Sequence, residues 1–176
     1  MKKFIATLIA LTFLICGINY AQDKSDNELN LPSMTLEQKM DRLMLNTAGM
    51  IANSIGYIKS VGGSAAGLGE YVGNVFSEGW SSLKGSGPKV FVETMYKNYQ
   101  SDPDNKFEVV GVTDNSVTYK TSRFLGSKMM YYLNDKVTQQ DIDDCYEKLI
   151  ETIANSLGLQ YTQKFESDGV VITISK

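Results

Sequence analysis

Apolar side chains recur every three or four residues along much of the first hundred positions, which is the spacing of amphipathic helices. Thr35 can cap the first of these helices, with Gln38 three residues later as its capping-box partner. The pair Gly62-Gly63 interrupts the pattern, and Pro88 suits the first turn of a later helix. We therefore predict three consecutive helices, over 36–60, over 65–83 and from Pro88 to about Tyr99.

On each predicted helix the apolar residues share one face, which is expected to turn toward the core. On the first helix this face contains Leu36, Met40, Leu43, Met44, Thr47, Met50, Ile51, Ser54, Ile55 and Ile58. On the second it contains Leu68, Val72, Val75, Phe76 and Leu83. On the third it contains Phe91, Val92, Met95, Tyr96 and Tyr99.

The pattern changes after the turn at 101–105. Residues 107–112 and 117–123 are rich in β-branched and aromatic side chains and flank the turn-forming sequence 113–116, which predicts a β-hairpin. A second hairpin is predicted from 159–165 and 170–174 around a Ser-Asp-Gly turn.

Between the hairpins, Thr138 and Asp141 mark the start of the clearest helix in the chain, and Gly158 is its expected C′ residue. Its apolar face contains Ile142, Cys145, Tyr146, Leu149, Ile153 and Leu157. Residues 124–136 fit a helix or a strand equally well.

This order of elements predicts an α+β fold in a single domain, 35–176. An antiparallel sheet of about four strands, made of two hairpins, packs against an N-terminal group of helices and one long C-terminal helix. Residues 23–34 are polar, carry Pro32 and are predicted to form a disordered leader.

The first 22 residues have the pattern of a secretory signal peptide. Lys2 and Lys3 precede an apolar run that ends at Gly17 and is too short to span a bilayer comfortably. Cleavage is expected after Ala21 or Gln22, which would release a periplasmic or extracellular protein. An alternative is a lipoprotein anchored through Cys16; membrane association is expected only in that case or if the signal stays uncleaved.

Charge and composition narrow the possible functions. Removal of residues 1–22 takes away two lysines and no acid, which leaves 15 basic and 20 acidic residues and argues against a nucleic-acid partner. The chain contains no histidine, which excludes histidine-dependent nucleophilic catalysis and the usual His-containing zinc sites. Cys145 lies on an apolar helix face and fits a buried structural thiol. We predict no catalytic residue, metal site or cofactor, and a non-enzymatic role.

Aromatic side chains offer the leading candidate site. Tyrosine presents an apolar ring and one hydroxyl, so a group of such residues between helices and sheet can enclose a small apolar or amphipathic ligand. The candidates for this site are Trp80, Tyr96, Tyr99, Tyr119, Tyr132 and Tyr146. The competing interpretation is that these rings fill an ordinary core.

Glycines suggest an alternative function. Gly49, Gly56 and Gly63 recur every seven residues along the first helix, and Gly69 and Gly73 lie on the second. Glycine faces on helices 36–60 and 65–83 would suit a structural or protein-interaction module of the cell envelope, or close packing within the chain. A third hypothesis, an enzyme without histidine, predicts a carboxylate buried beside a tyrosine in a cleft.

Overall fold

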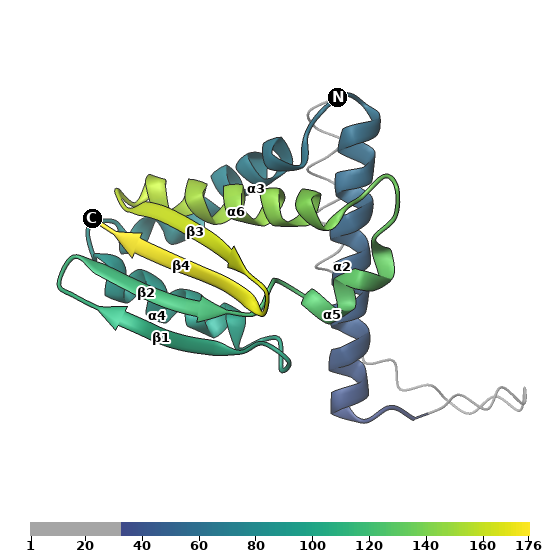
Figure 1. The fold of residues 1–176 in the computed structure, drawn as a ribbon, viewed down its shortest axis with the longest axis horizontal. Coiled ribbons are helices and arrows are strands. Elements are labelled where there is room, and N and C mark those ends of the chain that lie inside the picture. The colour runs from purple at the N-terminus through teal and green to yellow at the C-terminus, as the bar shows by residue number, and fades with distance from the viewer. Residues whose placement is uncertain (1–32) are drawn as a thin grey trace, which may run out of the picture. The chain divides into compact units, whose positions relative to one another are not determined.

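The computed structural model describes residues 33–176, so the predicted signal peptide and the leader up to Pro32 lie outside the described residues. Among these residues, three α-helices precede the first strand (Figure 1): α2 (Leu36–Ser60), α3 (Ala65–Trp80) and α4 (Pro88–Tyr99). A 3-10 turn, η2 (Ser81–Leu83), follows α3 directly. Thr35 and Gln38 form the predicted capping box, and Pro88 opens α4, so the three predicted helices are confirmed.

The two predicted hairpins form one sheet. Its strands are β1 (Phe107–Val112), β2 (Ser116–Thr121), β3 (Gln160–Glu166) and β4 (Gly169–Ser175). They lie in the order β1-β2-β4-β3, and every neighbouring pair is antiparallel. The α+β class with a four-stranded antiparallel sheet is therefore confirmed.

The helix predicted between the hairpins is α6 (Gln139–Ser156). Thr138 and Asp141 form its capping box, and Gly158 follows its end with a φ of 77°, a value that favours glycine. Residues 124–136, whose sequence did not distinguish helix from strand, contain the short helix α5 (Gly126–Met129), the 3-10 turn η3 (Met130–Tyr132) and a turn.

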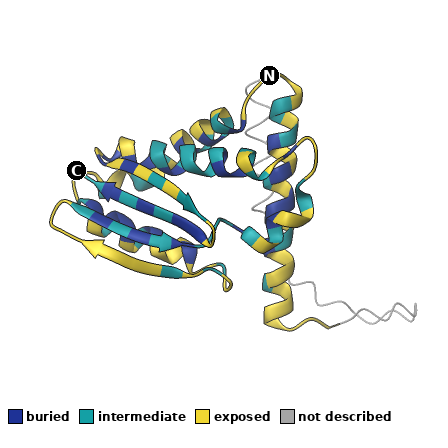
Figure 2. Ribbon diagram, viewed as in Figure 1, coloured by how far each residue is buried: buried dark blue, intermediate teal, exposed yellow. Residues whose placement is uncertain are grey.

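The main core lies between one face of the sheet and the helices α4 and α6 (Figure 1). Buried residues alternate along β2 and β4, which places every second side chain of these strands in the core (Figure 2). A second, smaller core joins α2 to α5 and to the starts of α3 and α6. In the part of the chain that the structure describes, no helix is both long and apolar enough to cross a membrane.

The predicted core faces of α2, α3 and α4 are each wrong in part. On α2 the buried face consists of Met44, Ala48, Ala52 and Ile55, while Leu36, Leu43 and Met50 are exposed. On α3 the buried residues are Ala65, Gly69 and Gly73, while Val75 and Phe76 are exposed. Tyr96 on α4 is also exposed rather than buried.

The glycines explain the orientation of α3. A side chain at Gly69 would overlap the backbone of Cys145 in α6, and a Cβ at Gly73 would lie 2.8 Å from the carbonyl oxygen of Leu149. The two helix backbones approach closely only where α3 lacks side chains, so its glycine face packs on α6 and its larger apolar residues turn outward.

Candidate functional site

Three of the predicted site residues meet inside the main core. Tyr99 of α4 and Tyr119 of β2 belong to this core, with their hydroxyls 3.3 Å apart, and Tyr146 of α6 is partly buried against it. Burial raises the pKa of each of these phenols well above its usual value, so all three stay protonated at neutral pH. Their rings fill the space between the helices and the sheet.

The other predicted site residues are dispersed. Trp80 packs on Phe91 with ring centroids 5.3 Å apart, and Tyr96 packs edge-on against Phe107 at 5.0 Å. Tyr132 packs against the second core instead, beside Gly49 of α2. The six residues therefore do not line one common pocket.

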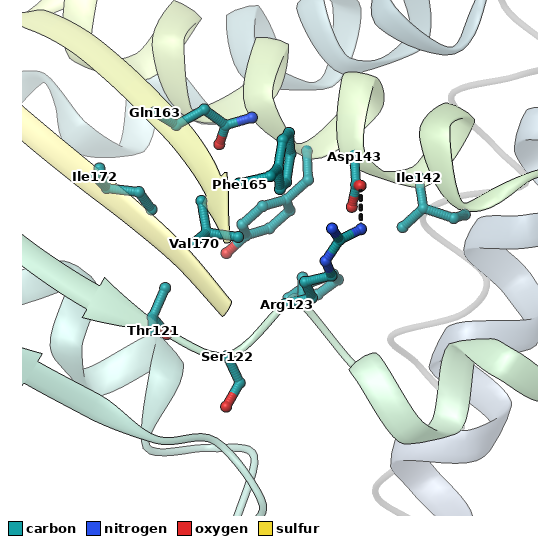
Figure 3. Close-up of a pocket in the computed structure, with 11 residues that line it drawn as sticks. Thr121, Ser122, Arg123, Ile142, Asp143, Gln163, Phe165, Val170 and Ile172 are labelled. Atoms are coloured by element: carbon teal, nitrogen blue, oxygen red, sulfur yellow. Dashed lines mark hydrogen bonds and ion pairs between the residues drawn. The ribbon is translucent and has the colours of Figure 1, made fainter. Parts of the chain in front are cut away.

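A small cavity remains at the end of the main core, beside an ion pair (Figure 3). Arg123 Nη1 lies 2.5 Å from Asp143 Oδ2, and Gln139 Nε2 donates to Asp143 Oδ1 at 2.9 Å. The guanidinium also covers the ring of Phe165, 4.8 Å from its centroid. Burial raises the pKa of Asp143, while Gln139 and Arg123 act in the opposite direction.

This cavity is too small to hold a ligand larger than water. Its volume is about 20 Å³, which is room for a single water molecule. Gln163 Nε2 is buried at its wall and has no hydrogen-bond partner among the described residues, so such a water would satisfy it. Asp143 and Tyr146 both line the cavity, yet no substrate fits between them. The ion pair links the segment after β2 to α6, and we interpret its role as structural.

A much larger depression lies between α2 and residues 131–137, and we call it the α2 groove. Its volume is about 380 Å³, within the range of small-molecule sites. One wall consists of Ala52, Asn53, Gly56, Tyr57 and Ser60 of α2. The other consists of Tyr131, Tyr132, Asn134, Lys136 and Val137.

Local structure determines the shape of the α2 groove. A Cβ at Gly49 would lie 2.8 Å from the ring of Tyr132, so the glycine permits the segment 131–137 to approach α2. Asn134 Oδ1 accepts hydrogen bonds from the backbone nitrogens of Lys136 and Val137, at 2.8 and 3.1 Å. These bonds hold the turn that forms the outer wall.

The lining of the α2 groove combines apolar and polar groups. Tyr57 and Tyr131 are 61% and 79% exposed, so their rings are available to a ligand. Asn53 and Ser60 add an amide and a hydroxyl, and Lys136 is the only charged side chain among the described residues of the lining. A site of this composition can bind a molecule, and the lining residues that the structure describes include no carboxylate or thiol.

Of the predicted site residues, the α2 groove contains Tyr132 alone. Asn53, Tyr57 and Lys136 gave no recognisable signal in the sequence. The groove joins two segments about 75 residues apart, and the second of them had no assigned secondary structure. A scan against protein-family models finds no match for this chain, and a search of curated proteins finds no similar sequence.

Proposed function

We propose that this chain is an exported, non-enzymatic binding protein that holds a small amphipathic ligand in the α2 groove. The observation that carries the proposal is the groove itself, a depression of about 380 Å³ with exposed tyrosine rings on both walls. The N-terminal pattern of two lysines and a short apolar run supports export.

The lining suggests the class of ligand. Tyrosine rings offer flat apolar surfaces at little conformational cost, and their hydroxyls add hydrogen bonds. Asn53 can donate and accept hydrogen bonds, and Lys136 supplies one positive charge. A ligand with an apolar face and several hydroxyl groups, such as a sugar with an aliphatic substituent, matches this combination.

The expected position of the ligand differs from the one inferred from the sequence. Between the helices and the sheet, the rings of Tyr99, Tyr119 and Tyr146 occupy the core, and the cavity at its end has room for one water. The α2 groove is a depression of ligand size on the described part of the chain, so the proposal moves the ligand to the groove beside α2.

A titration followed by NMR tests this proposal. We use octyl glucoside below its critical micelle concentration as the amphipathic probe, glucose as the head group alone, and the isotopically labelled exported protein. Saturable shifts are expected at residues 52–60 and 131–137 with octyl glucoside, and weaker ones with glucose. Tyr131→Ala is expected to weaken binding about tenfold.

Tyr96→Ala is the matched control, because Tyr96 is an exposed tyrosine on α4, outside the groove. It is expected to leave the affinity for octyl glucoside unchanged. The proposal is wrong if the groove resonances do not shift at saturating probe, or if both tyrosine variants weaken binding equally.

A second candidate function, an interaction module of the cell envelope, is favoured by a different observation. Three of the five glycines named as its contact surface are covered within the chain, since Gly49 meets Tyr132, and Gly69 and Gly73 meet α6. However, large apolar side chains remain exposed on the outer sides of α2 and α3. These side chains, rather than the glycines, would contact a partner.

A further inference from the structure

Helix α2 has two apolar faces, and only one of them packs on the rest of the chain. Met44, Ala48, Ala52 and Ile55 are buried in the second core. A separate set at seven-residue intervals is turned to solvent: Leu36, Leu43, Met50 and Tyr57 are exposed by 77%, 47%, 47% and 61%. The first turns of α2 are exposed on most sides (Figure 2).

The exposed set is part of a heptad pattern. Met40, Thr47 and Ser54 fall between its members, and Val61 follows as the C-cap residue of α2. Apolar or small residues therefore alternate at intervals of four and three residues from Leu36 to the end of the helix. This is the spacing of the a and d positions of a coiled coil. We call these eight residues the outer stripe.

The two polar members of the outer stripe carry no unpaired donor. Thr47 Oγ1 donates to the carbonyl oxygen of Leu43 at 2.9 Å, and Ser54 Oγ donates to that of Met50 at 2.8 Å. A partner helix can therefore cover both residues at little cost in lost hydrogen bonds.

From this pattern we infer that the outer stripe binds a second copy of this chain, with the two α2 helices antiparallel. An antiparallel pair places each a residue opposite a d residue. The stripe is symmetric about a point between Thr47 and Met50, so one register pairs all eight residues. Its layers are Leu36 with Val61, Met40 with Tyr57, Leu43 with Ser54, and Thr47 with Met50 of the second copy.

Charge does not oppose a second copy at this surface. The charged side chains near the start of α2 are Glu37, Lys39, Asp41 and Arg42, two of each sign. In the antiparallel register, Lys39 lies beside Ser60 of the second copy and Asn46 lies beside Asn53, so neither pair brings like charges together. The dipoles of the two helices also run in opposite directions. The exposed apolar face of α3 is flanked by Glu70 and Glu78 instead, which would repel the same residues of a second copy.

The size of the contact predicts a weak, reversible dimer. A helix of 25 residues is about 37 Å long. Eight stripe side chains burying about 75 Å² each would remove roughly 1,200 Å² from water in the pair, the lower limit for a specific interface. We therefore expect association in the micromolar range.

Sedimentation equilibrium of the exported protein tests the inference, at protein concentrations from a few to several hundred micromolar. A monomer–dimer equilibrium is expected, and Leu43→Glu is expected to raise the dissociation constant tenfold or more by burying a charge in the stripe. Val75→Glu is the matched control, because Val75 is 55% exposed on α3. A protein that stays monomeric throughout, or a dimer broken by Val75→Glu and not by Leu43→Glu, overturns the inference.

Disulfide trapping tests the orientation. A mixture of Leu36→Cys and Val61→Cys proteins is expected to form a crosslinked heterodimer, while neither variant alone crosslinks to itself. Crosslinking of Leu36→Cys alone indicates a parallel pair and contradicts the antiparallel register. These experiments use no probe ligand, so their outcome does not depend on whether the groove binds one. Repeating the groove titration on the Leu43→Glu protein, which is expected to stay monomeric, separates ligand binding from association.

Discussion

Asp141 stabilises the start of α6 in two ways. Its Oδ2 accepts a hydrogen bond from the backbone nitrogen of Thr138 at 2.8 Å, which completes the capping box. The same oxygen lies 2.6 Å from Lys59 Nζ, so the residue also ties α6 to the end of α2. Partial burial acts to raise the pKa of Asp141, but the bonds from Lys59 and Thr138 prevail and hold it below its ordinary value.

This lowered pKa predicts a pH-dependent contribution to stability. A carboxyl group whose pKa is lower in the folded state stabilises the fold above its unfolded pKa, about 3.9, and loses that effect as pH falls through the folded pKa. Asp141→Asn is expected to lower the free energy of unfolding by about 1–2 kcal/mol at pH 7. The difference from the unmodified protein should shrink steadily below pH 4.

Urea unfolding at neutral and acidic pH measures this effect. Asp114→Asn serves as the control, because the side chain of Asp114 is 99% exposed, and a change of less than about 0.5 kcal/mol is expected. A difference between Asp141→Asn and the unmodified protein that stays constant down to pH 2 would show that the carboxylate charge is not responsible.

Residue type alone did not determine the role of each tyrosine. Tyr119 of β2 is fully buried in the main core, whereas Tyr131 is 79% exposed at the α2 groove. By contrast, the burial inferred for Cys145 from its apolar helix face is confirmed. Its thiol is buried, and burial raises its pKa to about 11.

At the scale of elements, the contact between α3 and α6 depends on two glycines. Gly69 and Gly73 face the backbone of α6, where a Cβ would overlap Cys145 or lie 2.7 Å from Thr152 Cβ. Packing of the predicted apolar stripe at this contact would have kept the helices farther apart. The choice of face therefore follows from how closely two helices can approach.

Substitution of these glycines tests the close approach. Gly73→Ala is expected to cost about 1–3 kcal/mol, because it forces α3 away from α6. Gly79→Ala is the control within the same helix: no atom lies within 4 Å of its added Cβ, so it should stabilise the protein by up to about 1 kcal/mol. Both values come from urea unfolding, and equal stabilities for the two variants would contradict the packing described.

The two apolar faces of α2 illustrate a limit of periodicity. The sequence pattern placed Leu36, Met44 and Met50 on one broad face, but the helix buries Met44 and exposes the other two. A broad apolar arc on a helix wheel is compatible with a core on either side of it. Which part is buried depends on the position of α5 and α6.

At the scale of the whole molecule, the described residues pack around two hydrophobic cores. The main core holds the sheet on α4 and α6, and the smaller one holds α2 against α5. Both the α2 groove and the outer stripe lie on the α2 side, and Tyr57 belongs to each of them. In the proposed dimer, Met40 of the second copy lies beside this residue, at the rim of the groove.

Export is the prediction that concerns the entire chain. We expect the purified envelope or secreted protein to begin at Gln22 or Asp23, as N-terminal sequencing and intact mass would show. A protein that begins at Cys16 with added lipid mass would establish the lipoprotein alternative, and an N-terminus at Met1 would contradict cleavage.

The sequence by itself determined the local features of this protein. Capping boxes at Thr35 and Thr138, the glycine after α6 and the two hairpins depend on neighbours within a few residues, so their element order and the α+β class were predicted correctly. The tertiary structure alone decided which face of α2 and α3 is buried, the pairing of Arg123 with Asp143, and the α2 groove. Each of these joins residues distant in the chain, and their contact depends on how closely whole elements pack.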